Sequence, residues 1–80
     1  MAGIITADLH GKTVYQAKVT VDALLRRVNG GTYRIRLIHG CHGGTALRQM
    51  VRTVYARHPK VRRIELGLNP GVTELVLREY

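Results

Sequence analysis

The sequence is short of cysteine, of long apolar runs and of acidic residues, and each shortage excludes something. Its single cysteine, Cys41, cannot form a disulfide within the chain, which fits the reducing cytoplasm. No segment approaches the roughly 20 consecutive apolar residues that a membrane span requires, and the amino terminus lacks the basic and then apolar pattern of an export signal. We therefore expect a cytoplasmic protein with no membrane partner.

The shortage of acidic residues leaves a large positive charge. Five Asp and Glu face thirteen Lys and Arg, ten of them Arg, which gives a formal net charge of +8 in 80 residues. The planar guanidinium group matches phosphate geometry, so this excess favours a polyanion such as nucleic acid as the partner. A basic surface that merely keeps the protein soluble is the alternative. The length suffices for one hydrophobic core, so we expect a single domain over residues 1–80, acting as a monomer.

Cap and turn residues divide the first half of the chain into a strand, a helix and a strand. Ile4 to Leu9 is a short apolar run that stops at a glycine turn. Thr13 and Gln16 form a capping box, which starts a helix whose apolar stripe is Val14, Ala17, Val21, Leu24, Leu25 and Val28. We expect Asn29-Gly30-Gly31 to end this helix in a left-handed cap. Tyr33 to Leu37 alternates apolar and basic residues, as in a strand with one buried face.

The second half predicts a helix followed by a hairpin. Thr45 is expected to cap a helix that ends at His58-Pro59 and has as its apolar side Leu47, Met50, Val51 and Val54. Alternation from Arg63 to Leu68 and from Thr73 to Arg78, around Asn69-Pro70-Gly71, predicts two paired strands. The order strand-helix-strand-helix-strand-strand, with right-handed crossovers, predicts an α/β two-layer sandwich: a four-stranded mixed sheet with two helices on one face.

The other face of this sheet is expected to be open and charged. By the alternation of each strand it presents Thr6, Asp8, Arg34, Arg36, Arg63, Glu65, Glu74 and Arg78. Arg34 and Arg36 make this face a candidate platform for phosphates. A solvated face with cross-strand pairs of Arg and Glu is the alternative.

Two glycine corners hold the residues best suited to catalysis. Asp8-Leu9-His10-Gly11 and Ile38-His39-Gly40 each place a histidine at the carboxyl end of a strand, where open α/β sheets bind ligands. Asp8 lies two residues from His10 and can orient its ring, and His39 lies beside them if the two strands pair. One histidine as base and another as acid could cleave a phosphodiester bond, so Asp8, His10 and His39 are the candidate catalytic residues. Histidines with a structural role are the alternative.

The second corner also predicts a phosphate site. Backbone amides at a helix amino terminus bind anions, and the residues there are Gly40, Gly43, Gly44 and Thr45. Arg48 lies in the first turn, where a cation opposes the helix dipole unless it meets an anion, and Arg52 follows one turn later. An exposed Arg48 without a ligand is the alternative.

Metal binding is weakly indicated. Asp8 is the only carboxylate near the corners, whereas Mg²⁺ prefers several oxygen ligands, and His39, Cys41 and His42 lack the fourth ligand of a zinc site. We expect no resident metal, and a divalent cation such as Mg²⁺ stays open as a cofactor.

These motifs resemble the small MutS-related (Smr) domain. Asp8 to Gly11 is similar to the family's DLHG motif, His39-Gly40 with Gly44 to Arg48 is similar to its HGxG and LR signature, and Val72 to Leu77 is similar to its closing strand. The similarity extends from Ile5 to Leu77, with Cys41 where the family usually carries Lys or Arg. The resemblance implies a two-layer α/β sandwich that nicks or cleaves DNA or RNA, with Asp8, His10 and His39 implicated.

The sequence therefore supports two alternative functions. The first is an endonuclease for RNA or DNA that uses the aspartate and the two histidines. The second is a non-catalytic module that binds RNA, DNA or a ribosomal surface through Arg34, Arg36, Arg48 and Arg52. An enzyme for small phosphate compounds is less favoured, because so small a core leaves little room for an apolar pocket.

Overall fold

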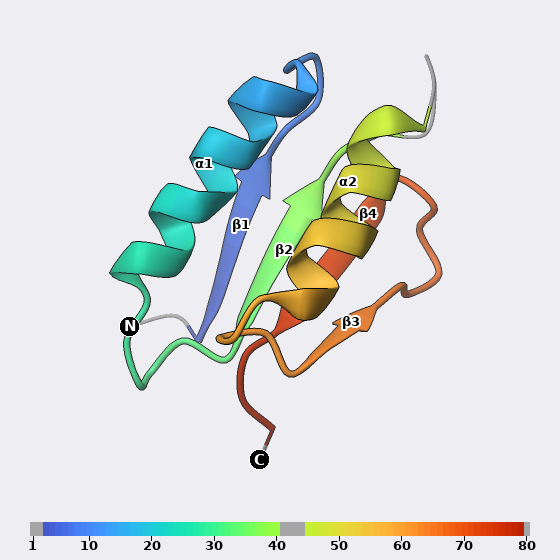
Figure 1. The fold of residues 1–80 in the computed structure, drawn as a ribbon. Helices are drawn as coiled ribbons and strands as arrows, with labels where there is room; N and C mark the ends of the chain where they lie inside the picture. Colours follow the sequence, from blue (N-terminus) through green and yellow to red (C-terminus); the bar gives the residue numbers. More distant parts are fainter. Residues whose placement is uncertain (1–2, 41–44, 80) are drawn as a thin grey trace.

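The computed structural model describes residues 3–40 and 45–79. The elements in chain order are β1 (Ile4–Asp8), α1 (Val14–Arg27), β2 (Arg34–Ile38), α2 (Ala46–Val54), the 3₁₀ helix η1 (Tyr55–Arg57), β3 (Arg63–Glu65) and β4 (Val72–Val76) (Figure 1). The predictions for Cys41, His42, Gly43 and Gly44 lie outside the described residues.

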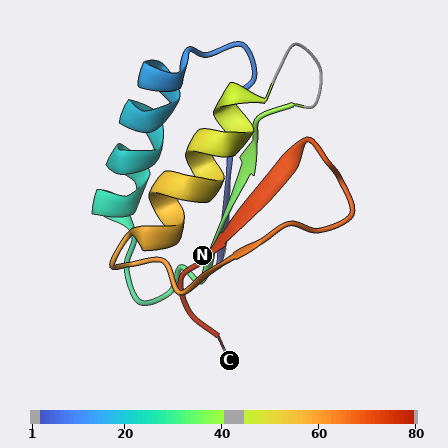
Figure 2. The ribbon, with the colours of Figure 1, turned by 45° about the vertical axis from the view of Figure 1, so that its right-hand side comes forward.

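The four strands form one mixed sheet in the order β1-β2-β4-β3. β1 pairs with β2 in parallel, and β4 pairs antiparallel with both β2 and β3. Both helices cover the same face, so helices and sheet form two layers (Figure 2). The predicted two-layer α/β sandwich is confirmed.

The start of α1 forms as its sequence predicts, and its end does not. The Thr13 hydroxyl accepts a hydrogen bond from the Gln16 amide at 3.1 Å, and the Gln16 side chain accepts one from the Thr13 amide at 3.0 Å. Val28, which follows the helix, is extended, and the described glycines with positive φ are Gly11, Gly40 and Gly67. The predicted left-handed cap is therefore wrong: the Asn29 side chain accepts a hydrogen bond from the Gly31 amide at 2.8 Å and closes the turn itself.

The core lies between the helices and the sheet. Its fully buried side chains include Leu9, Val21, Ile35, Leu37, Val51, Tyr55 and Leu75. The predicted apolar stripes are wrong at Val14 and Val54, each 40% exposed. The chain tightens into η1 after Val54 and turns Tyr55 inward instead, where its hydroxyl donates a hydrogen bond to Asp22 Oδ1 at 2.7 Å.

Two further boundaries differ from the sequence prediction. Thr45 precedes α2 but makes no side-chain capping bond, and its side chain is exposed. The predicted strand to Leu68 ends at Glu65, because Gly67 turns the chain with a φ of 63° and Leu66 and Leu68 are exposed. The hairpin itself is confirmed by the antiparallel pairing of β3 with β4.

Candidate functional site

The parallel pairing of β1 with β2 brings the two glycine corners together. Asp8 is in register with Ile38, and the Leu9 amide donates a hydrogen bond to the Ile38 carbonyl at 2.7 Å. Both corners then turn at a glycine in the left-handed region, with φ of 81° at Gly11 and 82° at Gly40. A β-carbon at Gly40 would lie 3.8 Å from Cδ2 of His10. The two corners therefore lie side by side, as the sequence predicts.

A pocket of about 410 Å³ opens between the corners at this end of the sheet. It lies beside the first turns of both helices, and its lining is His10, Gly11, Lys12, Thr13, Val14, His39, Gly40, Ala46, Leu47 and Arg48. Among the described residues of this lining, the cations are Lys12 and Arg48, and none carries a carboxylate. Two helix amino termini and two cations give the pocket a positive potential that suits an anion.

The Asp8 carboxylate stabilises the backbone of the first corner. Its Oδ1 accepts a hydrogen bond from the His10 amide at 2.9 Å, which closes a turn where β1 ends. The predicted carboxylate and imidazole pair is therefore a main-chain contact in this structure. The His10 side chain is exposed beside the pocket, and among residues 3–40 and 45–79 no hydrogen-bond partner of its ring is found. Its ring is accessible to a ligand.

His39 is held on both sides of its ring. It is 5% exposed, with Nδ1 2.8 Å from the Gly40 carbonyl oxygen and Nε2 2.8 Å from the Thr73 hydroxyl. A carbonyl oxygen can only accept, so Nδ1 carries the proton and Nε2 accepts a hydrogen bond from Thr73. The Arg52 Nε donates in turn to the Thr73 oxygen at 3.1 Å. We call this chain of contacts, from Arg52 through Thr73 and His39 to the Gly40 carbonyl, the His39 relay.

The surroundings of His39 keep its ring neutral. Burial lowers the pKa of the imidazole below its usual value of 6.5, and the positive charges of Arg52 and Arg48 lower it further, against the opposing effect of the hydrogen bond to Gly40. A neutral ring with both nitrogens engaged must leave one of its partners before it can exchange a proton with a substrate. The geometry therefore gives His39 a positioning role at the second corner.

The start of β4 clamps the same corner. The Gly71 carbonyl accepts hydrogen bonds from the His39 amide at 2.9 Å and the Gly40 amide at 3.0 Å. The Gly40 amide, predicted to bind phosphate, is thus already engaged, and Gly40 serves the pocket by its conformation. A β-carbon at Gly71 would meet the Gly40 backbone at 3.4 Å, an ordinary van der Waals contact, so the two segments lie close together.

The open face of the sheet is a network of ion pairs. Arg34 Nη1 lies 2.9 Å from Glu65 and 2.5 Å from Glu74, and Arg36 Nε lies 2.7 Å from Glu74. Arg63 bridges Glu65 and Glu79 at the edge of the sheet. Hydrogen bonds from Arg34 and Arg63 lower the pKa of Glu65, which keeps it charged. The cross-strand alternative is therefore the one that the structure shows, and Arg34 and Arg36 are placed away from the corner pocket.

Lys12 and Thr73 are site residues that the sequence analysis missed. Lys12 follows His10-Gly11 directly, so a cation at a glycine corner was a usable signal. Thr73 is a polar residue, fully buried, at an inward position of a strand, and its partner His39 lies 34 residues away in the chain. Spacing within the sequence gives no sign of that contact.

The described residues show neither a metal cluster nor a membrane-spanning helix. Within residues 3–40 and 45–79, no three side chains of His, Cys, Asp or Glu gather as metal ligands would. In the same ranges, no helix has the length and apolar character needed to cross a membrane.

Comparisons with known proteins agree with this architecture. The family model described as the Smr domain matches residues 7–71. A crystal structure of the Smr domain of Thermus thermophilus MutS2 superposes with a TM-score of 0.83 at 34% sequence identity, covering 94% of this chain and 99% of that chain. A comparison with curated proteins found no match. The family match spans the two glycine corners, and this chain belongs to the Smr domain family.

Proposed function

We propose that this Smr domain is a nucleic-acid endonuclease that binds a phosphodiester group in the pocket between its two glycine corners. The observation that carries the proposal is the convergence of His10, Lys12 and Arg48 on one pocket at the carboxyl ends of two parallel strands. Ligands bind at this position in open α/β sheets. The +8 charge of the chain favours a polyanion there.

Lys12 and Arg48 supply the charge that phosphate requires. Arg48 lies in the first turn of α2, where it opposes the helix dipole, and a bound anion between it and Lys12 removes that penalty. The same cations stabilise the negative charge that develops on the phosphoryl oxygens during cleavage. Arg34 and Arg36 are neutralised by Glu65 and Glu74, so we assign them to the sheet.

His10 is the group for proton transfer in this proposal. Its neutral ring takes the proton of the attacking hydroxyl or water as the new P–O bond forms, and its protonated ring returns that proton to the leaving oxygen as the old P–O bond breaks. His39 positions the Gly40 carbonyl beside His10 in the pocket lining through the His39 relay. Asp8 fixes the corner through the His10 amide.

A non-catalytic binding module is the second candidate, and one observation favours it. His39 has both ring nitrogens engaged, which removes the second histidine from an acid and base pair. Binding through Lys12 and Arg48 needs no free histidine.

Cleavage and binding of end-labelled RNA and DNA, with Mg²⁺ and with chelator, separate the two functions. His10→Ala should reduce the cleavage rate by about 10²- to 10⁴-fold, the usual contribution of a positioned acid or base, with affinity unchanged. His58→Ala is the matched control, because His58 lies outside the pocket lining, against Tyr55. Parent protein that binds without cleaving supports the module instead, and absence of binding at low salt overturns both functions.

The salt dependence of affinity tests whether Lys12 and Arg48 contact phosphate. Lys12→Gln and Arg48→Gln should each reduce the slope of log affinity against log salt concentration by about one, the value for one phosphate contact. Circular dichroism should show both variants folded, since both side chains lie at the pocket surface. An unchanged slope in both variants would remove the pocket as the phosphate site.

A further inference from the structure

Ion pairs neutralise some of the cations, so the net positive charge of the molecule lies on the cations that have no carboxylate partner. Four of the five acidic residues pair with cations, and their partners are Lys18, Arg34, Arg36 and Arg63. In the described ranges 3–40 and 45–79, nine of the thirteen cations make no ion pair with a carboxylate: Lys12, Arg26, Arg27, Arg48, Arg52, Arg57, Lys60, Arg62 and Arg78. Their positions show where an anion meets uncompensated charge.

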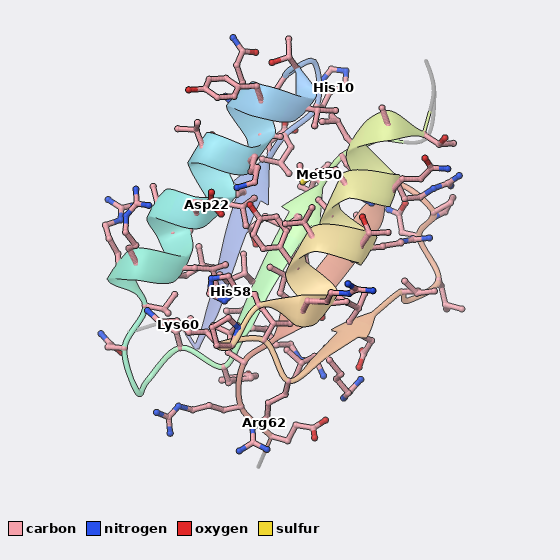
Figure 3. All side chains as sticks on the ribbon, viewed as in Figure 1. His10, Asp22, Met50, His58, Lys60 and Arg62 are labelled. Carbon is pink, nitrogen blue, oxygen red and sulfur yellow. The ribbon has the colours of Figure 1, made fainter. Side chains whose placement is uncertain are left out.

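Three of these cations line a groove at the end of the sheet opposite the corner pocket. We call it the distal groove: it has a volume of about 510 Å³ and is lined by Val28, Asn29, Gly30, Thr32, Pro59, Lys60, Arg62, Leu77 and Arg78. The segments after α1, η1 and β4 form it, and none of its lining residues is acidic. Lys60 and Arg62 lie at one end of the molecule and His10 lies at the other (Figure 3).

The residues that carry the cations of the distal groove are anchored to neighbouring elements to different degrees. Lys60 Nζ donates a hydrogen bond to the Leu25 carbonyl, in the last turn of α1, at 2.6 Å. The Arg62 amide is bonded to the Val76 carbonyl at 2.8 Å, which anchors the loop before β3 to β4. The Arg78 guanidinium lies over Gly30, where a β-carbon would come within 3.6 Å of it. The groove is therefore lined by three cations, of which Lys60 is held by a hydrogen bond of its ammonium group and Arg62 is anchored through its backbone.

We propose that the distal groove is a second contact for the sugar-phosphate backbone, so that the domain takes a nucleic acid long enough to reach both ends of the molecule. This inference rests on the proposed function, because the same polyanion occupies the corner pocket. The longest extent of the domain is 35 Å. At 3.4 Å per base pair, about ten base pairs of duplex cover that length. The substrate class is thus an extended duplex or strand.

The test compares two double variants that remove the same charge. Arg62→Gln with Arg78→Gln empties the distal groove of two cations. Lys18→Gln with Arg63→Gln is the matched control, since both of its cations are ion-paired and exposed. Fluorescence anisotropy measures binding over a salt series to a duplex of about 16 base pairs and to a hairpin stem of about five, which is too short to span the domain at 3.4 Å per base pair.

The groove variant should reduce the salt slope on the long duplex by about two, the loss of two phosphate contacts, and leave the slope on the short stem unchanged. The control should change neither. If the two double variants show the same salt slope on the long duplex while the parent protein binds it, the distal groove is not a phosphate contact. The proposed function is unaffected by that result. Parent protein that at low salt binds neither the long duplex nor a single strand of RNA or DNA of the same length overturns both. Displacement of the long duplex from the groove by polyglutamate at equal charge concentration would instead indicate an acidic protein partner and refute the nucleic-acid assignment.

Discussion

Thr73→Val tests the His39 relay, because valine keeps the shape of threonine and removes the hydroxyl. The Thr73 hydroxyl donates its hydrogen to His39 Nε2 at 2.8 Å, and its oxygen accepts a hydrogen bond from Arg52 Nε at 3.1 Å. Thr73 is fully buried and His39 is 5% exposed, so no water replaces the hydroxyl at Nε2 without a rearrangement. A buried acceptor without a donor costs about 1–3 kcal/mol. Arg52 is less buried and can turn to solvent, so it adds little.

The expected loss is therefore about 1–3 kcal/mol of unfolding free energy in Thr73→Val, equivalent to about 4–8 °C in Tm per kcal/mol for a domain of this size. Urea denaturation followed by circular dichroism measures it. Thr73→Ser is the control, because it keeps the hydroxyl and loses one buried methyl group, at a cost of about 1 kcal/mol.

A second readout distinguishes the hydrogen bond from packing. Nuclear magnetic resonance of the His39 ring should show the Nδ1-protonated tautomer in the parent and in Thr73→Ser, because the Gly40 carbonyl requires a donor there. In Thr73→Val the neutral ring loses a stabilising donor, so the pKa of His39 should rise toward its usual value. A valine variant as stable as the parent, with the same His39 titration, would refute the relay.

Other contacts give three further outcomes. Because burial lowers the pKa of His39 in the folded state, the unfolded state binds that proton more readily. The contribution of His39 to the unfolding free energy should therefore be complete above about pH 6.5 and decrease below it, by at most about 1.4 kcal/mol per pH unit. Urea denaturation at a series of pH values measures this dependence, which should be weaker in His39→Gln. Tyr55→Phe should cost about 1.5–3 kcal/mol, since the hydroxyl bonds the charged Asp22 at 2.7 Å, and an unchanged urea midpoint would refute this. Gly40→Ala should lower the unfolding free energy by about 1–2 kcal/mol, because φ of Gly40 is 82°. Gly30→Ala is the control: φ of Gly30 is not positive, so the unfolding free energy should hardly change in the same urea assay.

The sequence by itself determined the features whose partners are close along the chain. Thr13 and Gln16 are three residues apart, so their capping box forms wherever the chain turns into a helix. The alternation from Tyr33 to Leu37 determined which side chains face the core, because a strand has a period of two. The glycines after His10 and His39 determined both corners, since each needs a positive φ.

The sequence prediction was wrong where two neighbouring residues suited the same structural position. Asn29 and Gly30 both suit the end of α1, and the side chain of Asn29 closed the turn before a left-handed glycine was needed. Val54 and Tyr55 both suit the core side of α2, and the tightening of the last turn into a 3₁₀ helix turned the aromatic ring inward. Where two neighbouring residues are equally suited, tertiary packing determines which of them ends the helix or enters the core.

Only the tertiary structure decided how the site residues are used. β4 lies between β2 and β3, which brings Thr73 to His39 and Glu74 to Arg34 and Arg36 across 34 to 40 residues of chain. Alternation shows which face of a strand is buried, but it does not give the strand order or the register across the sheet. A buried threonine therefore engaged a histidine that the sequence offers as a catalyst, and two glutamates neutralised arginines that the sequence offers to phosphate. Of the nine cations without an ion pair in residues 3–40 and 45–79, five line the corner pocket and the distal groove, whereas Glu65 of β3 and Glu74 of β4 are paired on the open face of the sheet.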